Sequence, residues 1–80
     1  MTAARAPTDT DRLTVYDHNH LNEYLRLLDA DGDGVPWEVA ARDILGLDPD
    51  HDPSGAWATW DSHLDRAKWI RDGGYRLLLR

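Results

Sequence analysis

Residues 52–74 read DPSGAWATWDSHLDRAKWIRDGG and predict the longest helix of the chain, over 53–72. Asp52 is a favourable N-cap, Pro53 suits the first turn of a helix, and a pair of glycines ends the segment. The side chains expected to face the core recur every three or four residues: Trp57, Trp60, Leu64, Ala67 and the stem of Arg71. Trp69 projects to nearly the opposite side of this helix and therefore needs a partner of its own.

Two shorter helices are predicted before the long one. Asp17 is a good N-cap for a helix over 18–29. The apolar side chains that share one face of this helix are Leu21, Tyr24, Leu25 and Leu28. Leu27 lies about 100° away from that face. The next helix is predicted over 36–45, after an Asp-Gly-Asp-Gly turn, with Gly46 as its C-cap.

The two ends of the chain are less regular. Residues 1–12 have no apolar period, so we expect a mobile tail followed by a domain over 13–80. The leucine-rich end, 75–80, suits either a short strand paired with 13–16 or an extra helical turn. We expect an all-α fold, a three-helix variant of the helix-turn-helix domain whose turn over 47–52 is extended.

Composition narrows the possible functions. The chain has 80 residues and no cysteine, so disulfides, thiolate metal sites and cysteine nucleophiles are excluded. No segment resembles a catalytic motif or a transmembrane span of about 20 apolar residues. We expect a monomeric cytoplasmic protein that is not an enzyme, uses no cofactor and does not bind membranes.

The acidic charge is concentrated in the middle of the chain. The formal net charge is −6, and the segment 29–52 carries eight acidic residues and one basic residue. A field of this sign repels a phosphate backbone. The charge therefore favours a protein partner over nucleic acid.

The same segment contains a partial calcium-loop motif. Asp29, Asp31 and Asp33 occupy the first, third and fifth positions of such a loop, and Gly34 occupies the sixth. The twelfth position, where a glutamate should complete the coordination, is Ala40. We therefore interpret the segment as an acidic turn between helices. The four histidines lack a metal-binding spacing, so we assign no metal site.

A DNA-binding helix-turn-helix regulator is the main alternative. The long helix would then occupy the recognition position. Its outward residues would be Thr59, Ser62, His63 and Arg66, and the phosphate contacts would come from Lys68, Arg71, Arg76 and Arg80. Asp61 and Asp65 on the same helix argue against this reading, because carboxylates are repelled by phosphates.

Several segments carry a resemblance to a known family. They are LRLLDA at 25–30, WEVA at 37–40, WDSHLDRAKW at 60–69 and GYRLL at 74–78. The chain resembles a proteobacterial family of helix-turn-helix domains with an extended turn, carried by regulators of integrative and conjugative element transfer such as the activator FseA. The resemblance spans about 13–80.

The resemblance implies an antiactivator. Activators of this family join a basic, DNA-binding copy of the domain to an N-terminal domain that packs against it. A free-standing acidic copy would occupy that N-terminal domain, block activation of transcription under quorum-sensing control, and bind DNA weakly or not at all. For the contact with the activator we select apolar residues off the main stripes or near the C-terminus: Leu27, Trp69, Ile70, Tyr75 and Leu79.

Overall fold

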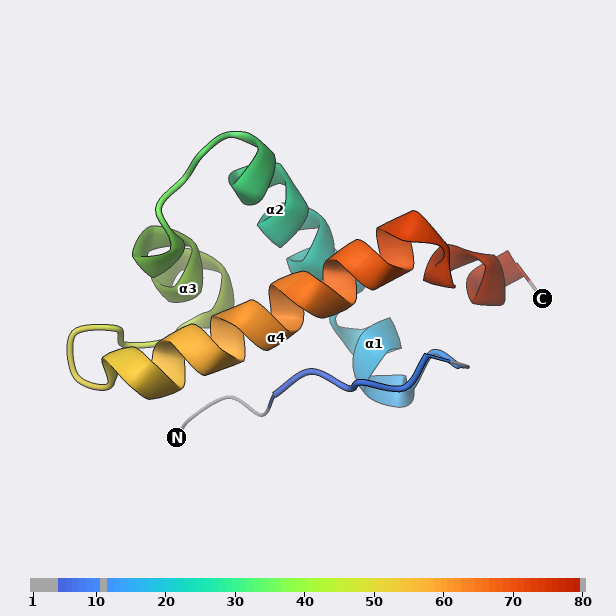
Figure 1. Ribbon diagram of the computed structural model, residues 1–80, viewed down its shortest axis with the longest axis horizontal. Coiled ribbons are helices and arrows are strands. Elements are labelled where there is room, and N and C mark those ends of the chain that lie inside the picture. Colours follow the sequence, from blue (N-terminus) through green and yellow to red (C-terminus); the bar gives the residue numbers. More distant parts are fainter. Residues whose placement is uncertain (1–4, 11, 80) are drawn as a thin grey trace.

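The computed structural model describes residues 5–10 and 12–79, with side chains described up to residue 77, and its regular structure is helical. The elements are α1 (Val15–Asn19), α2 (Leu21–Gly32), α3 (Trp37–Leu45), α4 (Pro53–Asp72) and a 3-10 helix, η1 (Gly74–Leu79). In Figure 1, α4 crosses the whole molecule, with α2 and α3 on one side and α1 with the N-terminal segment on the other. The expected all-α, helix-turn-helix-like fold is confirmed.

The long helix and its caps agree with the prediction. The Asp52 carboxylate accepts a hydrogen bond from the backbone N–H of Gly55, and Pro53 begins the first turn. Helix α3 starts one residue later than predicted, because Pro36 is its N-cap. Gly46 ends α3 in the left-handed conformation, with φ 66°, as its position after the last apolar residue predicts.

The start of the domain differs from the prediction. The expected single helix over 18–29 is two helices, α1 and α2, which are divided at His20. The N-cap of α1 is Thr14, whose side chain accepts a hydrogen bond from the backbone N–H of Asp17. In return the carboxylate of Asp17 accepts one from the backbone N–H of Thr14, which completes a capping box. Asp17 is therefore a buried residue within α1, not the cap of a later helix.

The C-terminal end is helical. No strand occurs within residues 5–10 and 12–79, so the proposed pairing of 75–80 with 13–16 is wrong. The alternative of a further helical turn is correct, since η1 follows α4 directly through Gly73. A leucine run is compatible with both structures, and only the packing next to α4 distinguishes them.

The core lies between α4 and the two helices that cross it. Buried side chains from α2, α3, α4 and the connection between α3 and α4 meet in three clusters: Tyr24, Ala67 and Ile70; Leu27, Ala40 and Leu64; Ala41, Leu47 and Ala56. Leu27 is only 1% exposed, whereas Leu25 is 63% exposed, the reverse of the predicted stripe. Helix α2 packs against both α3 and α4. Its buried face is therefore centred between these neighbours, and Leu25 falls just beyond it.

Candidate functional site

A buried ion pair ties α4 to α1. Arg66 donates from Nε to Asp17 Oδ1 at 2.9 Å and from Nη2 to Asp17 Oδ2 at 2.6 Å. The Tyr24 hydroxyl donates to Asp17 Oδ1 at 2.9 Å. The carboxylate thus has a bidentate guanidinium partner and further donors, which a charge out of water requires.

The pKa values in this network follow from its contacts. Burial alone would raise the pKa of Asp17, but hydrogen bonds from Arg66, the Thr14 backbone and Tyr24 lower it to about 2. The pKa of Tyr24 is raised, first by burial and then by its hydrogen bond to the Asp17 carboxylate. Asp17 is therefore ionised and Tyr24 neutral near pH 7.

A histidine lies fully buried one turn before Arg66. His63 Nδ1 is 2.6 Å from the Thr59 carbonyl oxygen, which can only accept, so Nδ1 carries the proton. Its Nε2 is 2.5 Å from the Tyr16 hydroxyl and accepts from it. Burial lowers the pKa of His63, and nearby His20 lowers it further, against the opposing effects of the Thr59 bond and Glu23. The ring is thus held neutral between α4 and α1.

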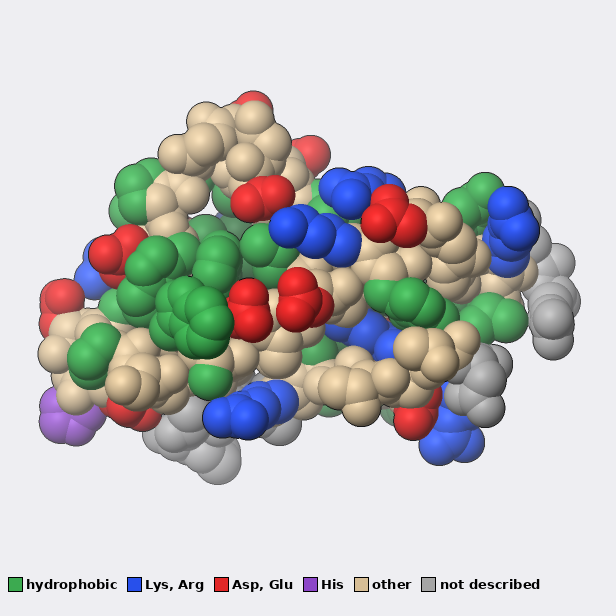
Figure 2. Space-filling model, viewed as in Figure 1, with side chains coloured by type: hydrophobic (Ala, Val, Ile, Leu, Met, Phe, Trp, Pro, Cys, Tyr) green, Lys and Arg blue, Asp and Glu red, His purple; other side chains and the backbone are tan. Residues whose placement is uncertain are grey.

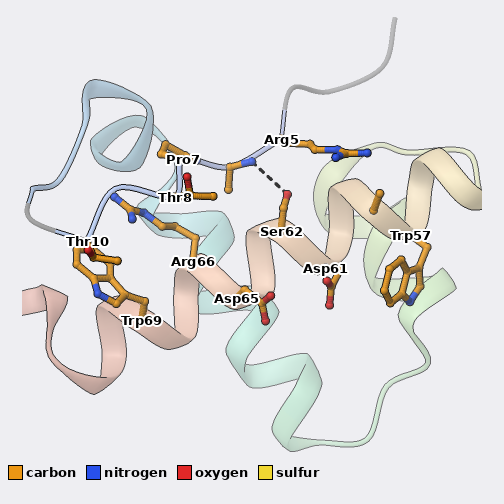
Figure 3. A pocket seen from close by; sticks show the side chains of 12 residues that line it. Arg5, Pro7, Thr8, Thr10, Trp57, Asp61, Ser62, Asp65, Arg66 and Trp69 are labelled. Atoms are coloured by element: carbon orange, nitrogen blue, oxygen red, sulfur yellow. Dashed lines mark hydrogen bonds between the residues drawn. The ribbon is translucent and has the colours of Figure 1, made fainter.

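The N-terminal segment makes contacts that the sequence did not predict. Ala6 is buried, and its backbone N–H donates to Ser62 Oγ at 3.1 Å. Arg66 also donates to the carbonyl oxygens of Asp9 and Arg12. A mobile tail was expected over 1–12, but residues 5–10 and 12 lie along α4 (Figure 3). The sequence of this segment has no apolar periodicity, and the contacts are made mainly by backbone groups, so no pattern in the sequence predicts them.

These contacts cover the face of α4 that was predicted to read DNA. Thr59, His63 and Arg66 are buried, and Ser62 is partly buried against residue 6. The prediction that these four residues face outward is therefore wrong. The prediction fails because α1 and the N-terminal segment pack on the side of α4 that a three-helix arrangement leaves open. Of the predicted phosphate contacts, Arg71 and Arg76 are exposed and Lys68 is partly buried, while Arg80 lies outside the described residues.

Next to this covered face, α4 carries a row of four residues spaced four apart: Trp57, Asp61, Asp65 and Trp69. Trp57 and Asp65 are exposed, whereas Asp61 is partly buried and Trp69 packs in part against the core. We call this row the α4 face. A hollow of about 490 Å³ runs beside it and is walled on the other side by residues 5–8 and 10. Figure 3 shows the row along the helix with the N-terminal segment above it. Trp57 was expected in the core but is 48% exposed, because the buried arc of α4 is shifted toward α1.

The centre of the α4 face is negative. Among the ion pairs of the described residues, none involves Asp61 or Asp65. Partial burial raises the pKa of Asp61, repulsion by Asp65 raises it further, and Lys68 partly opposes this. Figure 2 shows acidic side chains over the middle of α4, beside a group of hydrophobic side chains over its start. The two carboxylates thus repel each other, and a cation placed beside them would reduce this repulsion.

The residues predicted to contact the activator differ in how deeply they are buried. Leu27 and Ile70 belong to the core, 1% and 9% exposed, so neither presents its side chain at the surface of the chain. Both residues lie outside the apolar stripe predicted for their own helix. Each of these helices packs against more than one neighbour, however, so a side chain outside that stripe can still be buried. Trp69 is partly buried: the Arg66 guanidinium lies 4.2 Å from its ring centroid, and its ring also covers Gly74. Tyr75 is 44% exposed, and the side chain of Leu79 lies outside the described ones.

The partial calcium motif does not form a loop. Helix α2 continues through Gly32, so Asp29 and Asp31 are both helical. Residues two apart on a helix point about 200° from each other and cannot share one ion. Within the described residues, no three His, Cys, Asp or Glu side chains are grouped so that they could hold a metal ion.

No family model matches the chain, and no similar curated protein was found. Within the described residues, no helix combines the length and apolar character needed to cross a lipid bilayer.

Proposed function

We propose that the chain is an antiactivator of the QseM type. It binds a transcriptional activator of mobile-element excision and conjugative transfer through that activator's N-terminal domain, in the cytoplasm and as a monomer. Binding prevents the activator from stimulating transcription, and the chain itself does not engage DNA. The proposal joins the family resemblance to the properties of α4.

The observation that carries the proposal is the chemistry of the outward side of α4. Carboxylates along a recognition helix oppose its entry into the groove, because the groove is bordered by rows of negatively charged phosphates. Asp61 and Asp65 occupy the middle of this side, and Trp57 stands exposed beside them. Exposed aromatic anchors bordered by polar side chains are characteristic of protein interfaces.

The alternative of a DNA-binding regulator has less support. The polar residues of α4 that could contact bases, Thr59, His63 and Arg66, are buried under α1 and the N-terminal segment. The net charge of −6 opposes association with a polyanion as well. Exposed Arg71 and Arg76 would provide only weak contacts that salt abolishes.

Transcription from an activator-dependent promoter tests the function. The chain is co-expressed with the two-domain activator of a related mobile element and a reporter gene under that activator's promoter. We expect the reporter signal to fall to the level seen without activator, with the activator protein still present by immunoblot. A parallel mobility-shift assay with the promoter duplex at about 50 mM salt should show no complex with the chain alone.

Two results would contradict the proposal. An undiminished reporter signal at equal protein levels would remove the antiactivator function. A sequence-specific mobility shift by the chain alone would favour the DNA-binding regulator instead.

A further inference from the structure

The α4 face has the composition of an unoccupied binding surface. Trp57 remains 48% exposed, although an indole of this size is normally well buried in a small domain. Trp69, three turns further along α4, is held in place by Arg66 and Gly74 and lines the hollow with Trp57. Rigid aromatic side chains at both ends of a groove are suited to anchor a partner.

The charge between the two indoles specifies the sign of that partner. Asp61 and Asp65 are one helical turn apart and form no ion pair within the described residues. On α4, the Lys68 ammonium lies 3.8 Å from the Asp31 carboxylate of α2. Arg5 also lines the hollow, but within the described residues it pairs with neither carboxylate. A guanidinium or ammonium placed between the indoles would relieve the repulsion of the two carboxylates.

The spacing specifies the shape of the partner. Twelve residues separate Trp57 from Trp69 on a continuous helix, which corresponds to about 18 Å along its axis. Residues spaced four apart form a ridge inclined to the helix axis. Such ridges interdigitate with the same ridges of a second helix at a crossing angle of about 50°. An amphipathic helix therefore matches the α4 face in length and direction.

We propose that the α4 face binds a basic amphipathic helix of the partner protein, with an Arg or Lys opposite Asp61 and Asp65 and apolar side chains against Trp57 and Trp69. The inference rests on the proposed function, since it names the chemistry of the partner surface. It excludes an acidic or purely apolar partner helix.

A matched pair of synthetic peptides tests this surface on the full chain. The basic peptide is an alanine-rich helix with two leucines about 12 residues apart and two arginines between them at spacings of about four. In the acidic peptide, glutamate replaces both arginines. Fluorescence anisotropy of the labelled basic peptide should give a dissociation constant of about 10–100 μM at low salt, and the acidic peptide should not bind.

Variants of the chain locate the binding. The double substitution Asp61→Asn with Asp65→Asn should weaken binding of the basic peptide at least about tenfold, and Trp57→Ala should do the same. The control, Asp33→Asn with Asp43→Asn, changes the net charge equally at exposed positions away from the α4 face and should leave binding unchanged. Thermal unfolding of every variant verifies that it is folded.

Reversing the charge of the α4 face predicts a gain of binding, which an unfolded variant would not show. With Asp61→Arg and Asp65→Arg, the chain should lose the basic peptide and gain the acidic one. The inference is overturned if neither peptide binds, if both bind equally, or if the asparagine pair on the α4 face and the control pair behave alike. The peptides report only on the surface, so the reporter assay separates this inference from the proposed function. If the Asp61→Asn, Asp65→Asn chain represses the reporter as strongly as the unaltered chain does, this inference is overturned and the antiactivator function still holds.

Discussion

Arg66 Nη2 and Asp17 Oδ2 lie 2.6 Å apart, with side chains only 2% and 1% exposed, although 49 residues separate them in the chain. Removing the guanidinium would leave a carboxylate buried without its counter-ion. We therefore expect Arg66→Met to lower the free energy of unfolding by about 3–5 kcal/mol, measured by urea denaturation.

The matched control is Arg71→Met, which removes a guanidinium of the same helix from an exposed pair with Asp72. Exposed pairs contribute little to stability because water and salt screen them, so the free energy of unfolding should stay close to that of the unaltered chain. Equal effects of the two substitutions would mean that the Asp17–Arg66 pair does not hold α1 on α4.

His63 predicts a loss of stability in mild acid. Because burial lowers its folded-state pKa below the ordinary value of 6.5, the unfolded chain binds the proton more readily. The stability that His63 contributes is complete above about pH 6.5 and is lost as the pH falls toward the folded-state pKa. The hydrogen bond to the Thr59 carbonyl and the charge of Glu23 oppose this lowering of the pKa, whereas His20 adds to it. Urea midpoints measured between about pH 7.5 and 5 should therefore decrease.

His63→Gln should flatten this pH dependence, whatever it does to the stability at pH 7. His51→Gln, at an exposed position, should retain the slope of the unaltered chain. A His63→Gln chain with an undiminished slope would assign the effect to another group.

Two leucines of α2 form a direct test of the packing. Leu27→Ala should lower the free energy of unfolding by about 2–5 kcal/mol, because it removes a fully buried side chain between α3 and α4. Leu25→Ala should change it by less than about 0.5 kcal/mol, because that side chain is largely in solvent. Calorimetric unfolding of both variants measures the difference, and the reverse order would show that α2 is rotated.

The contact between Trp69 and the start of η1 can be tested by substituting Gly74. A Cβ at Gly74 would lie 2.6 Å from Trp69 Cζ3, so Gly74→Ala must displace the indole. We expect a loss of about 1–3 kcal/mol in the free energy of unfolding. The neighbouring Gly73 has open space at this position, so Gly73→Ala should be tolerated better. A Gly74→Ala chain as stable as Gly73→Ala would place the indole elsewhere.

The sequence by itself determined most of α3 and α4. Their ends depend on Asp52, Pro53 and Gly46, whose effects act over a few residues of backbone, and local periodicity predicts their lengths. The all-helical class of the fold and the acidic middle segment likewise needed no tertiary information. These features are readable because the atoms that interact are close in the chain.

The tertiary structure alone decided which face of each helix is buried. Asp17 is consistent with a helix cap by local rules, and only the distant Arg66 gives it a counter-ion in the core. The N-terminal segment has no periodicity, yet it covers one side of α4 through backbone groups that every sequence possesses. That cover moves the exposed side of α4 to Asp61 and Asp65. Burial depends on all neighbours of a helix together, and contacts between residues about 50 apart leave no periodic trace in the sequence.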